Sequence, residues 1–117
     1  MHGTLRDLAR LGNLLAHDGR RGGVQVVPEA WLQEATTANP VAAPGVADSF
    51  FGYGRHFWIF PGEQRQFALI GVRGQALFVD PSRRLVLAQT AVWPTPGDRA
   101  SRGELLAVWR GLTAGVN

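Results

Sequence analysis

The sequence predicts an α+β domain in which helices flank a small antiparallel sheet of three strands. Apolar residues recur at helical spacing near both ends of the chain, and aromatic and β-branched stretches fill its middle. The 15 Gly and 7 Pro residues separate these stretches and supply the turns. We therefore expect one domain, divided into a helical segment (1–38), a loop (39–49), the strands (50–93) and a C-terminal helix (101–114).

The first helix is expected over residues 4–18. Thr4 can cap its N-terminus, with Asp7 three residues later as in a capping box. Asp18-Gly19 is a stop signal. The apolar stripe that faces the core is expected to consist of Leu5, Leu8, Leu11 and Leu15.

Two further helices have recognisable starts. Val24–Val27 is expected to be extended because Pro28 follows it, and Pro28 suits the first turn of a helix over Pro28–Thr36. Ser101 and Glu104 predict a capping box for the last helix.

The strands are predicted between these helices. Phe50–Phe60 is aromatic-rich, and Phe67–Ile70 is a second strand, broken by glycines and continued by the extended stretch Ala76–Val79. Leu85–Val92 is apolar at nearly every position, which indicates a third, buried strand. A three-stranded sheet has two unpaired edges, and these need a cover. This is the first indication that the chain is a partial domain.

The composition excludes several classes of site. The chain has 12 Arg, no Lys and no Cys, with a net charge of +3, so lysine bases, P-loop lysines, disulfides and thiolate metal sites are absent. The Arg residues are scattered, which argues against nucleic-acid binding. His2, His17 and His56 show no ligand spacing, so we expect no metal and no cofactor. No apolar run approaches the roughly 18 residues of a membrane span, and no signal peptide is visible, which leaves the compartment open.

A self-contained Ser-His-Asp triad has little support. Ser82 lies in a turn signal, Ser101 is explained as a cap, and Ser49 has no nucleophile-elbow glycines around it.

The segment 68–81 is more informative, because Gly71 and Gly74 interrupt a strand-like run. Glycine in a strand often marks a close approach to the backbone, for example by a substrate carbonyl that accepts from a strand N–H. A bulge or a close strand crossing explains the same pattern, and spacing alone favours that structural interpretation.

At this segment the chain resembles the C-terminal part of the β-lactamase-related serine hydrolases, and most closely the 6-aminohexanoate-dimer hydrolase branch. The resemblance runs in order over nearly the whole chain. It is carried by Thr4-Leu-Arg-Asp-Leu-Ala-Arg-Leu-Gly12, Asp18-Gly-Arg20, Val26-Val-Pro-Glu-Ala-Trp31, Gly52-Tyr-Gly54 with Phe57-Trp58, and Gly71-Val-Arg-Gly-Gln75 through Asp80-Pro81.

The resemblance implies a substrate site at the last of these stretches. The family's third motif, Lys- or His-Thr-Gly, falls on Leu69-Ile70-Gly71, where only the glycine matches. The residue after that glycine donates the oxyanion N–H in this family, so Val72 is the implied donor. Arg73 is expected either beside a substrate carboxylate or in solvent. The implied substrate-binding residues are Gly71, Arg73, Gly74 and Gln75.

The family's Ser-x-x-Lys nucleophile and its catalytic tyrosine are both missing here, since the chain has no Lys and its lone Tyr53 belongs to the strand motif. The resemblance therefore implies a C-terminal piece of an amide or ester hydrolase that is inactive alone. Met1 falls at an internal position of the family, so an N-terminal segment or another chain is the expected partner, beside a small-molecule substrate. The alternative is a non-catalytic module that pairs through its sheet edges.

Overall fold

The computed structural model describes residues 3–43, 45 and 50–116. Its centre is an antiparallel sheet with five strands in the order β3-β4-β5-β6-β7, which confirms the predicted class but corrects the number of strands. The strands are β3 (Gly52–Tyr53), β4 (Trp58–Ile59), β5 (Phe67–Ile70), β6 (Ala76–Asp80) and β7 (Leu85–Gln89).

Two turns that the sequence analysis missed account for the extra strands. Residues 54–56 reverse the chain between β3 and β4, where Gly54 packs so closely on the Ala35 carbonyl that a side chain would not fit. Residues 71–75 form a hairpin loop between β5 and β6, whereas we had expected one interrupted strand. The glycines of the predicted interruption therefore belong to a chain reversal, in which Gly74 has a φ of +101° that other residues avoid and a Cβ at Gly71 would come within 2.7 Å of the Gln75 Oε1.

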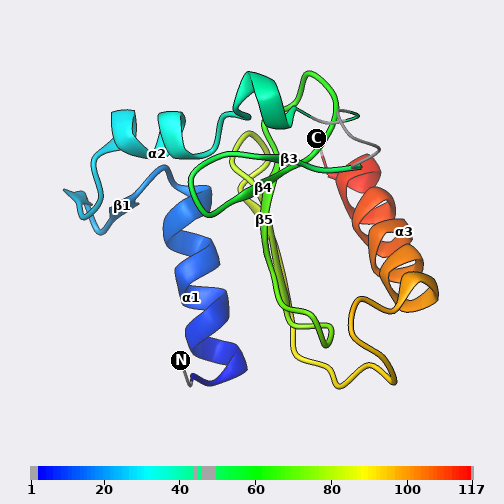
Figure 1. Ribbon diagram of the computed structural model, residues 1–117. Helices are drawn as coiled ribbons and strands as arrows, with labels where there is room; N and C mark the ends of the chain where they lie inside the picture. The colour runs from blue at the N-terminus through cyan, green and yellow to red at the C-terminus, as the bar shows by residue number, and fades with distance from the viewer. Residues whose placement is uncertain (1–2, 44, 46–49, 117) are drawn as a thin grey trace.

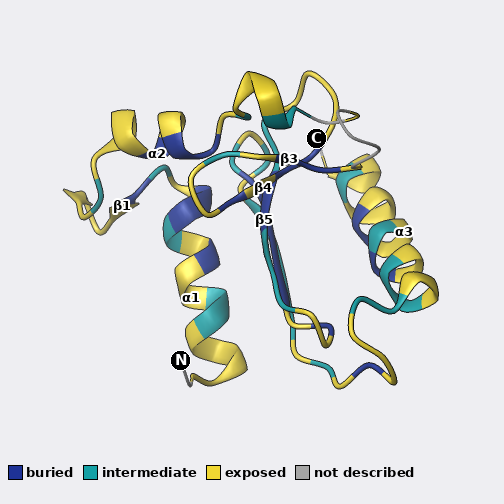
Figure 2. Cartoon of the chain, viewed as in Figure 1, coloured by how far each residue is buried: buried dark blue, intermediate teal, exposed yellow. Residues whose placement is uncertain are grey.

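The sheet stands between two helices, as Figure 1 shows, with α1 (Leu5–Ala16) on one face and α3 (Arg99–Gly115) on the other. Successive side chains of a strand point to opposite faces. Phe67, Leu77 and Val79 accordingly join the α1-side core, and Ala68 and Phe78 join the α3-side core. Figure 2 shows the buried sides of both helices turned toward the sheet.

The remaining elements follow the C-terminal end of α1, and the last of them lies by β3. They are the hairpin of β1 (Arg20–Arg21) and β2 (Val24–Gln25), the helix α2 (Glu29–Ala35), and the 3-10 turn η1 (Pro40–Ala42). The predicted loop 39–49 is described only in part, and Ser49, Met1 and His2 lie outside the described residues.

The start of α1 confirms the predicted capping box, since the Thr4 hydroxyl accepts from the Asp7 N–H and the Asp7 carboxylate accepts from the Thr4 N–H. The predicted stripe is only partly right. Leu15 is buried, but Leu5 and Leu11 are 47% and 40% exposed. The helix instead approaches the sheet at Gly12, because the lack of a side chain there lets the two backbones come close.

The start of α3 corrects the predicted cap. Asp98 is the N-cap, and its carboxylate accepts from the Ser101 N–H at 3.0 Å, so Ser101 lies inside the first turn. The helix is held by Trp109, which is 1% exposed. Burying roughly 200 Å² of indole stabilises this contact by about 5 kcal/mol. The Trp109 Nε1–H also donates to Gln66 at 3.2 Å.

Gln66 extends this link to the buried carboxylate of Asp80, to which its amide donates at 2.8 Å. Ser82 and the Arg83 guanidinium donate to the same carboxylate at 2.6 and 2.8 Å. Burial raises the pKa of Asp80, but the hydrogen bonds from Ser82, Gln66 and Arg83 outweigh it and hold the pKa below its ordinary value. The Asp80 carboxylate is therefore charged, accepts hydrogen bonds on both of its oxygens, and stabilises the β6–β7 turn.

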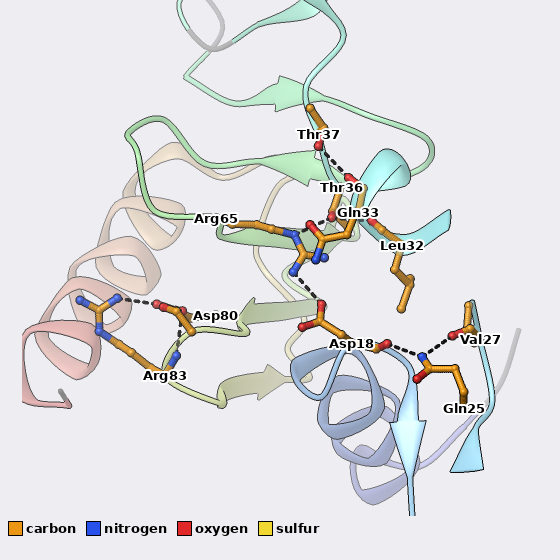
Figure 3. A network of polar contacts seen from close by, with 11 residues as sticks. Asp18, Gln25, Val27, Leu32, Gln33, Thr36, Thr37, Arg65, Asp80 and Arg83 are labelled. Carbon is orange, nitrogen blue, oxygen red and sulfur yellow. Dashed lines mark hydrogen bonds and ion pairs between the residues drawn. The ribbon is translucent and has the colours of Figure 1, made fainter. Parts of the chain in front are cut away.

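A second polar cluster, drawn in Figure 3, joins the end of α1 to α2 and to the segment before β5. The Arg65 guanidinium binds the Asp18 carboxylate at 2.7 Å and the Thr36 hydroxyl at 3.0 Å. Gln25 then ties the Asp18 carbonyl to the Val27 carbonyl. Because these side chains come from separate segments, the cluster fixes the helical segment against the sheet.

Candidate functional site

The loop between β5 and β6 carries all five residues that the family resemblance assigned to the site. The Gly71 N–H donates to the Gln75 carbonyl at 2.7 Å and closes the loop. Gly74 has φ +101° and lies flat on the Trp93 indole, where a Cβ would come within 2.6 Å of Nε1. Only glycine adopts this φ without strain and also leaves room for the indole, so this position sets the shape of the loop.

The loop is further fixed to the segment that follows β7. The Trp93 N–H donates to the Arg73 carbonyl at 2.9 Å, and the Gly97 N–H donates to the Val72 carbonyl at 2.6 Å. The Gln89 side chain donates to the Gly74 carbonyl at 2.8 Å. Because these bonds hold the carbonyl side of the loop, the orientation of its peptide groups is determined before any ligand binds.

The five residues do not all face the same space. Gly71 and Val72 line a hollow beside the end of β5, whereas the Arg73 guanidinium binds the carbonyls of Trp93 and Pro94, both at 3.2 Å. Arg73 was expected beside a substrate carboxylate or in solvent, and the structure gives it a third role, in which it ties the loop to the chain after β7.

The hollow measures about 420 Å³ and lies where β5 extends beyond β4. Strand β4 pairs only with Phe67 and Ala68, so within the described residues the end of β5 has a strand neighbour only in β6. This volume falls in the range of small-molecule sites, which are mostly apolar with a few polar groups. The lining residues are Phe50, Phe51, Trp58, Ile70, Gly71, Val72 and Arg102.

Two of these lining residues carry donors without a partner in the described part of the chain. The Val72 N–H makes no hydrogen bond there, while its carbonyl is held by Gly97. The Arg102 Nε is shielded from solvent and also lacks a partner among the described residues. A donor that is shielded from solvent is costly to leave unpaired, so the Arg102 Nε indicates where an acceptor would bind. Val72 is 68% exposed, so this argument does not extend to its N–H, which is available to an acceptor.

Sequence reasoning missed Arg102. It sits in the first part of α3, where an arginine is normally a solvent-exposed residue, and no local pattern distinguishes it from Arg99 or Arg110. Only the packing of α3 against the sheet brings it to the hollow.

The other candidate chemistries receive no support from the described residues. The Ser82 hydroxyl donates to Asp80, and Ser101 supplies its N–H to the Asp98 cap. Neither serine is hydrogen-bonded to a histidine in the described ranges, and the His17 Nδ1 lies 2.8 Å from the Asn13 carbonyl oxygen. No group of three or more His, Cys, Asp or Glu side chains that could hold a metal occurs in these ranges. The described helices are too short or too polar to cross a membrane.

No protein-family model matches the chain. It is 30% identical over 118 residues to the 6-aminohexanoate-dimer hydrolase of Paenarthrobacter ureafaciens, and the match covers 97% of this chain and 28% of that protein.

Two solved structures resemble the fold. The first is a protein from Bacillus anthracis named after 6-aminohexanoate-dimer hydrolase, with a TM-score of 0.73 and 24% identity, over 96% of this chain and 30% of that one. The second is a penicillin-binding protein homologue from Caulobacter crescentus, with a TM-score of 0.60 and 26% identity, over 80% of this chain and 28% of that one.

These matches confirm the resemblance that the sequence motifs indicated: the chain is related to the β-lactamase-related serine hydrolases and has the fold of their C-terminal part. Within that group, the 6-aminohexanoate-dimer hydrolases are the branch matched both in sequence and in structure. The chain spans less than a third of the length of these relatives.

Proposed function

We propose that these residues form one wall of the acylation pocket of a serine hydrolase that acts on amide or ester bonds, and that they are inactive alone. The observation that carries the proposal is the Val72 N–H, which is unpaired among the described residues and belongs to a residue lining an apolar hollow. The Gly71 N–H and the Val72 carbonyl lie on either side of the peptide group that carries this donor, and both are hydrogen-bonded, which supports the preorganisation that an oxyanion hole requires.

In the proposed reaction, a serine on polypeptide outside this chain attacks the substrate carbonyl. Its hydroxyl proton passes to a base, the amine or alcohol leaves with a proton, and water then releases the acyl group from the serine. The carbonyl oxygen gains negative charge in each tetrahedral intermediate, and the Val72 N–H donates to it. One such donor typically lowers the barrier by about 3–4 kcal/mol.

The test is a chimera in which this chain replaces the matching segment of the Paenarthrobacter hydrolase, assayed on the dimer that gives the hydrolase its name. We expect measurable hydrolysis by the chimera and none by this chain alone. In the chimera, Val72→Pro removes the N–H and should lower kcat at least 100-fold. Val72→Ala keeps the N–H and should retain activity within a few-fold.

Equal activity of the proline and alanine chimeras would contradict the role of this N–H, and turnover by the isolated chain would contradict its inactivity. If the chimera does not fold, the Val72 amide resonance of this chain decides the question. It should shift on titration with methyl phenylphosphonate, a tetrahedral anion that presents the oxyanion geometry without needing a serine to form an adduct. An unchanged Val72 resonance beside shifted neighbours would also contradict the proposal.

A second candidate function is pairing between copies of this chain. Strand β7 has a neighbour only on its β6 side in the described residues, and all five of its residues are half-buried. A hollow of about 530 Å³ at this strand is lined by Leu5 of α1 and by Leu105 and Val108 of α3, so an added strand would contact both helices. Unpaired strands of this kind commonly accept a further strand.

Light scattering between 10 and 500 µM tests this candidate. Self-pairing predicts a dimer that Val108→Glu abolishes, because the new carboxylate would be placed against the added strand. Val92→Glu is the matched control, since Val92 is 90% exposed and is not among the residues lining the hollow. A monomer at every concentration would exclude self-pairing.

A further inference from the structure

The loop between β5 and β6 and the segment that follows β7 hold each other through hydrogen bonds that all involve Val72 or Arg73 in the described residues. The Trp93 and Gly97 N–H groups donate to the carbonyls of the loop. In the opposite direction, the Arg73 guanidinium donates to the carbonyls of Trp93 and Pro94. Arg73 is therefore the residue whose side chain completes this connection.

The segment that follows β7 has few other ways to satisfy its backbone. It has no strand partner in the described residues, and Pro94 and Pro96 have no N–H to donate. Within the same ranges, the carbonyls of Trp93 and Pro94 accept hydrogen bonds from Arg73 alone. A guanidinium suits this place because it is always protonated, and its charged donors form stronger hydrogen bonds than neutral ones.

Arg73 reaches the proposed site only through the backbone. Its side chain is exposed and is not among those that line the hollow beside β5. By holding Trp93 and Pro94, it fixes the segment that carries Gly97. The Gly97 N–H in turn holds the Val72 carbonyl at 2.6 Å. Since a residue has only two soft backbone dihedrals, fixing the Val72 carbonyl also restricts the direction of the Val72 N–H.

We infer that Arg73 is a positioning residue for the proposed reaction: it holds the segment that follows β7, and that segment keeps the Val72 N–H directed at the oxyanion. The inference rests on the proposed function, because it explains how the donor of that function is held. A preorganised donor acts on the transition state more than on the bound substrate, so the role predicts an effect on kcat and not on KM. A displacement of about 1 Å at such a donor costs up to about 100-fold in rate.

The first test uses this chain alone and follows native-state amide hydrogen exchange. Arg73→Met keeps an unbranched stem and removes the donors. It should speed exchange of the Trp93 and Gly97 amides at least 10-fold and leave the amides of β6 unchanged, because only the segment is released. Arg73→Lys keeps a charged donor and should restore protection to within threefold. Arg110→Met removes the same charge from an exposed position of α3 and should change neither set of amides.

The second test uses the chimera with the Paenarthrobacter hydrolase. Arg73→Met should lower kcat about 10-fold and leave KM within twofold of the parent value. Arg73→Lys should bring kcat back to within threefold, and Arg110→Met should change neither constant. A residue that bound the substrate would raise KM instead, so the two constants separate positioning from binding.

Several results would overturn the inference. Unchanged exchange at Trp93 and Gly97 in the Arg73→Met chain would do so, as would equal acceleration at every amide, which would mean a general loss of stability. In the chimera, an unchanged kcat or a rise in KM alone would have the same meaning.

The two tests also separate this inference from the proposed function, because hydrogen exchange requires no nucleophile. Faster exchange in the Arg73→Met chain, beside equal activity of the Val72→Pro and Val72→Ala chimeras, would refute the proposed function and leave the hold of Arg73 on the segment intact. A Val72-dependent kcat that Arg73→Met leaves unchanged would refute only this inference.

Discussion

Gly12 is the position where α1 meets the sheet most closely, and it gives the sharpest test of the packing described above. A Cβ at this position would lie 2.5 Å from Val86 Cγ1 and 2.7 Å from Leu77 Cδ1. Ordinary carbon–carbon contacts are near 3.5–4.0 Å, so Gly12→Ala requires a displacement of about 1 Å. Leu77 is 1% exposed and packed on all sides, which leaves it little room to yield.

The expected magnitude follows from two opposing effects. Alanine favours a helix over glycine by about 1 kcal/mol. Overpacking a closed core costs about 1–3 kcal/mol, and the short contacts place Gly12 at the upper end of that range. We therefore expect Gly12→Ala to lower the free energy of unfolding by about 2 kcal/mol, measured by urea denaturation followed by circular dichroism.

The matched control is Gly111→Ala in α3. Gly111 is exposed and has no atom within 4 Å of its would-be Cβ, so only the helix preference acts there. It should raise the free energy of unfolding by about 0.5–1 kcal/mol. The double variant Gly12→Ala, Val86→Ala should cost less than the sum of its single changes, because the smaller side chain makes room. Equal stabilisation by both glycine substitutions would refute the close approach of α1.

Three further perturbations address the turns and the polar clusters. Asp80→Asn should lower the free energy of unfolding by about 2–3 kcal/mol at pH 7. Because the folded pKa of Asp80 is lowered, its contribution is present above the unfolded pKa and is lost as the pH falls below about 4, so the acid-induced loss should be shallower in the variant. Gly74→Ala should cost about 2–4 kcal/mol by combining a positive φ with a clash on Trp93, whereas Gly62→Ala, with φ +110° and open space, should cost only about 1 kcal/mol. Arg65→Met should cost about 1–2 kcal/mol and speed amide exchange at residues 17–19, which native-state hydrogen exchange would detect.

The elements that could be predicted from sequence are those whose signals are local. The Thr4 capping box, the start of α2 near Pro28 and the amphipathic α3 depend on residues within one or two turns of each other. The chain reversal at residues 71–75 was missed because Gly71 and Gly74 are equally consistent with a bulge and with a hairpin. Pairing between β5 and β6 decides between these alternatives, and pairing is not a local property.

The candidate site likewise has a part that the local sequence indicated and a part that only the fold brings together. The resemblance of Gly71 through Gln75 to the family's wall strand was enough to direct attention to this loop, and the comparisons confirm the relationship. It could not show that Arg73 is bound to the carbonyls after β7, nor that Arg102 lies at the hollow instead. Both facts depend on how the segment 93–102 folds back across the sheet.

Periodicity, caps and turn residues in the sequence alone therefore determined the helices and the α+β class, and its motifs indicated the resemblance to a known family. The tertiary structure alone decided the strand count, the core-facing side of α1 and the set of donors that meet at the hollow. The physical reason is the separation in sequence between the residues that each kind of interaction joins. Helical periodicity and capping act over a few residues, whereas strand pairing joins residues up to 13 positions apart. The approach of Arg102 to the end of β5 joins residues some thirty positions apart.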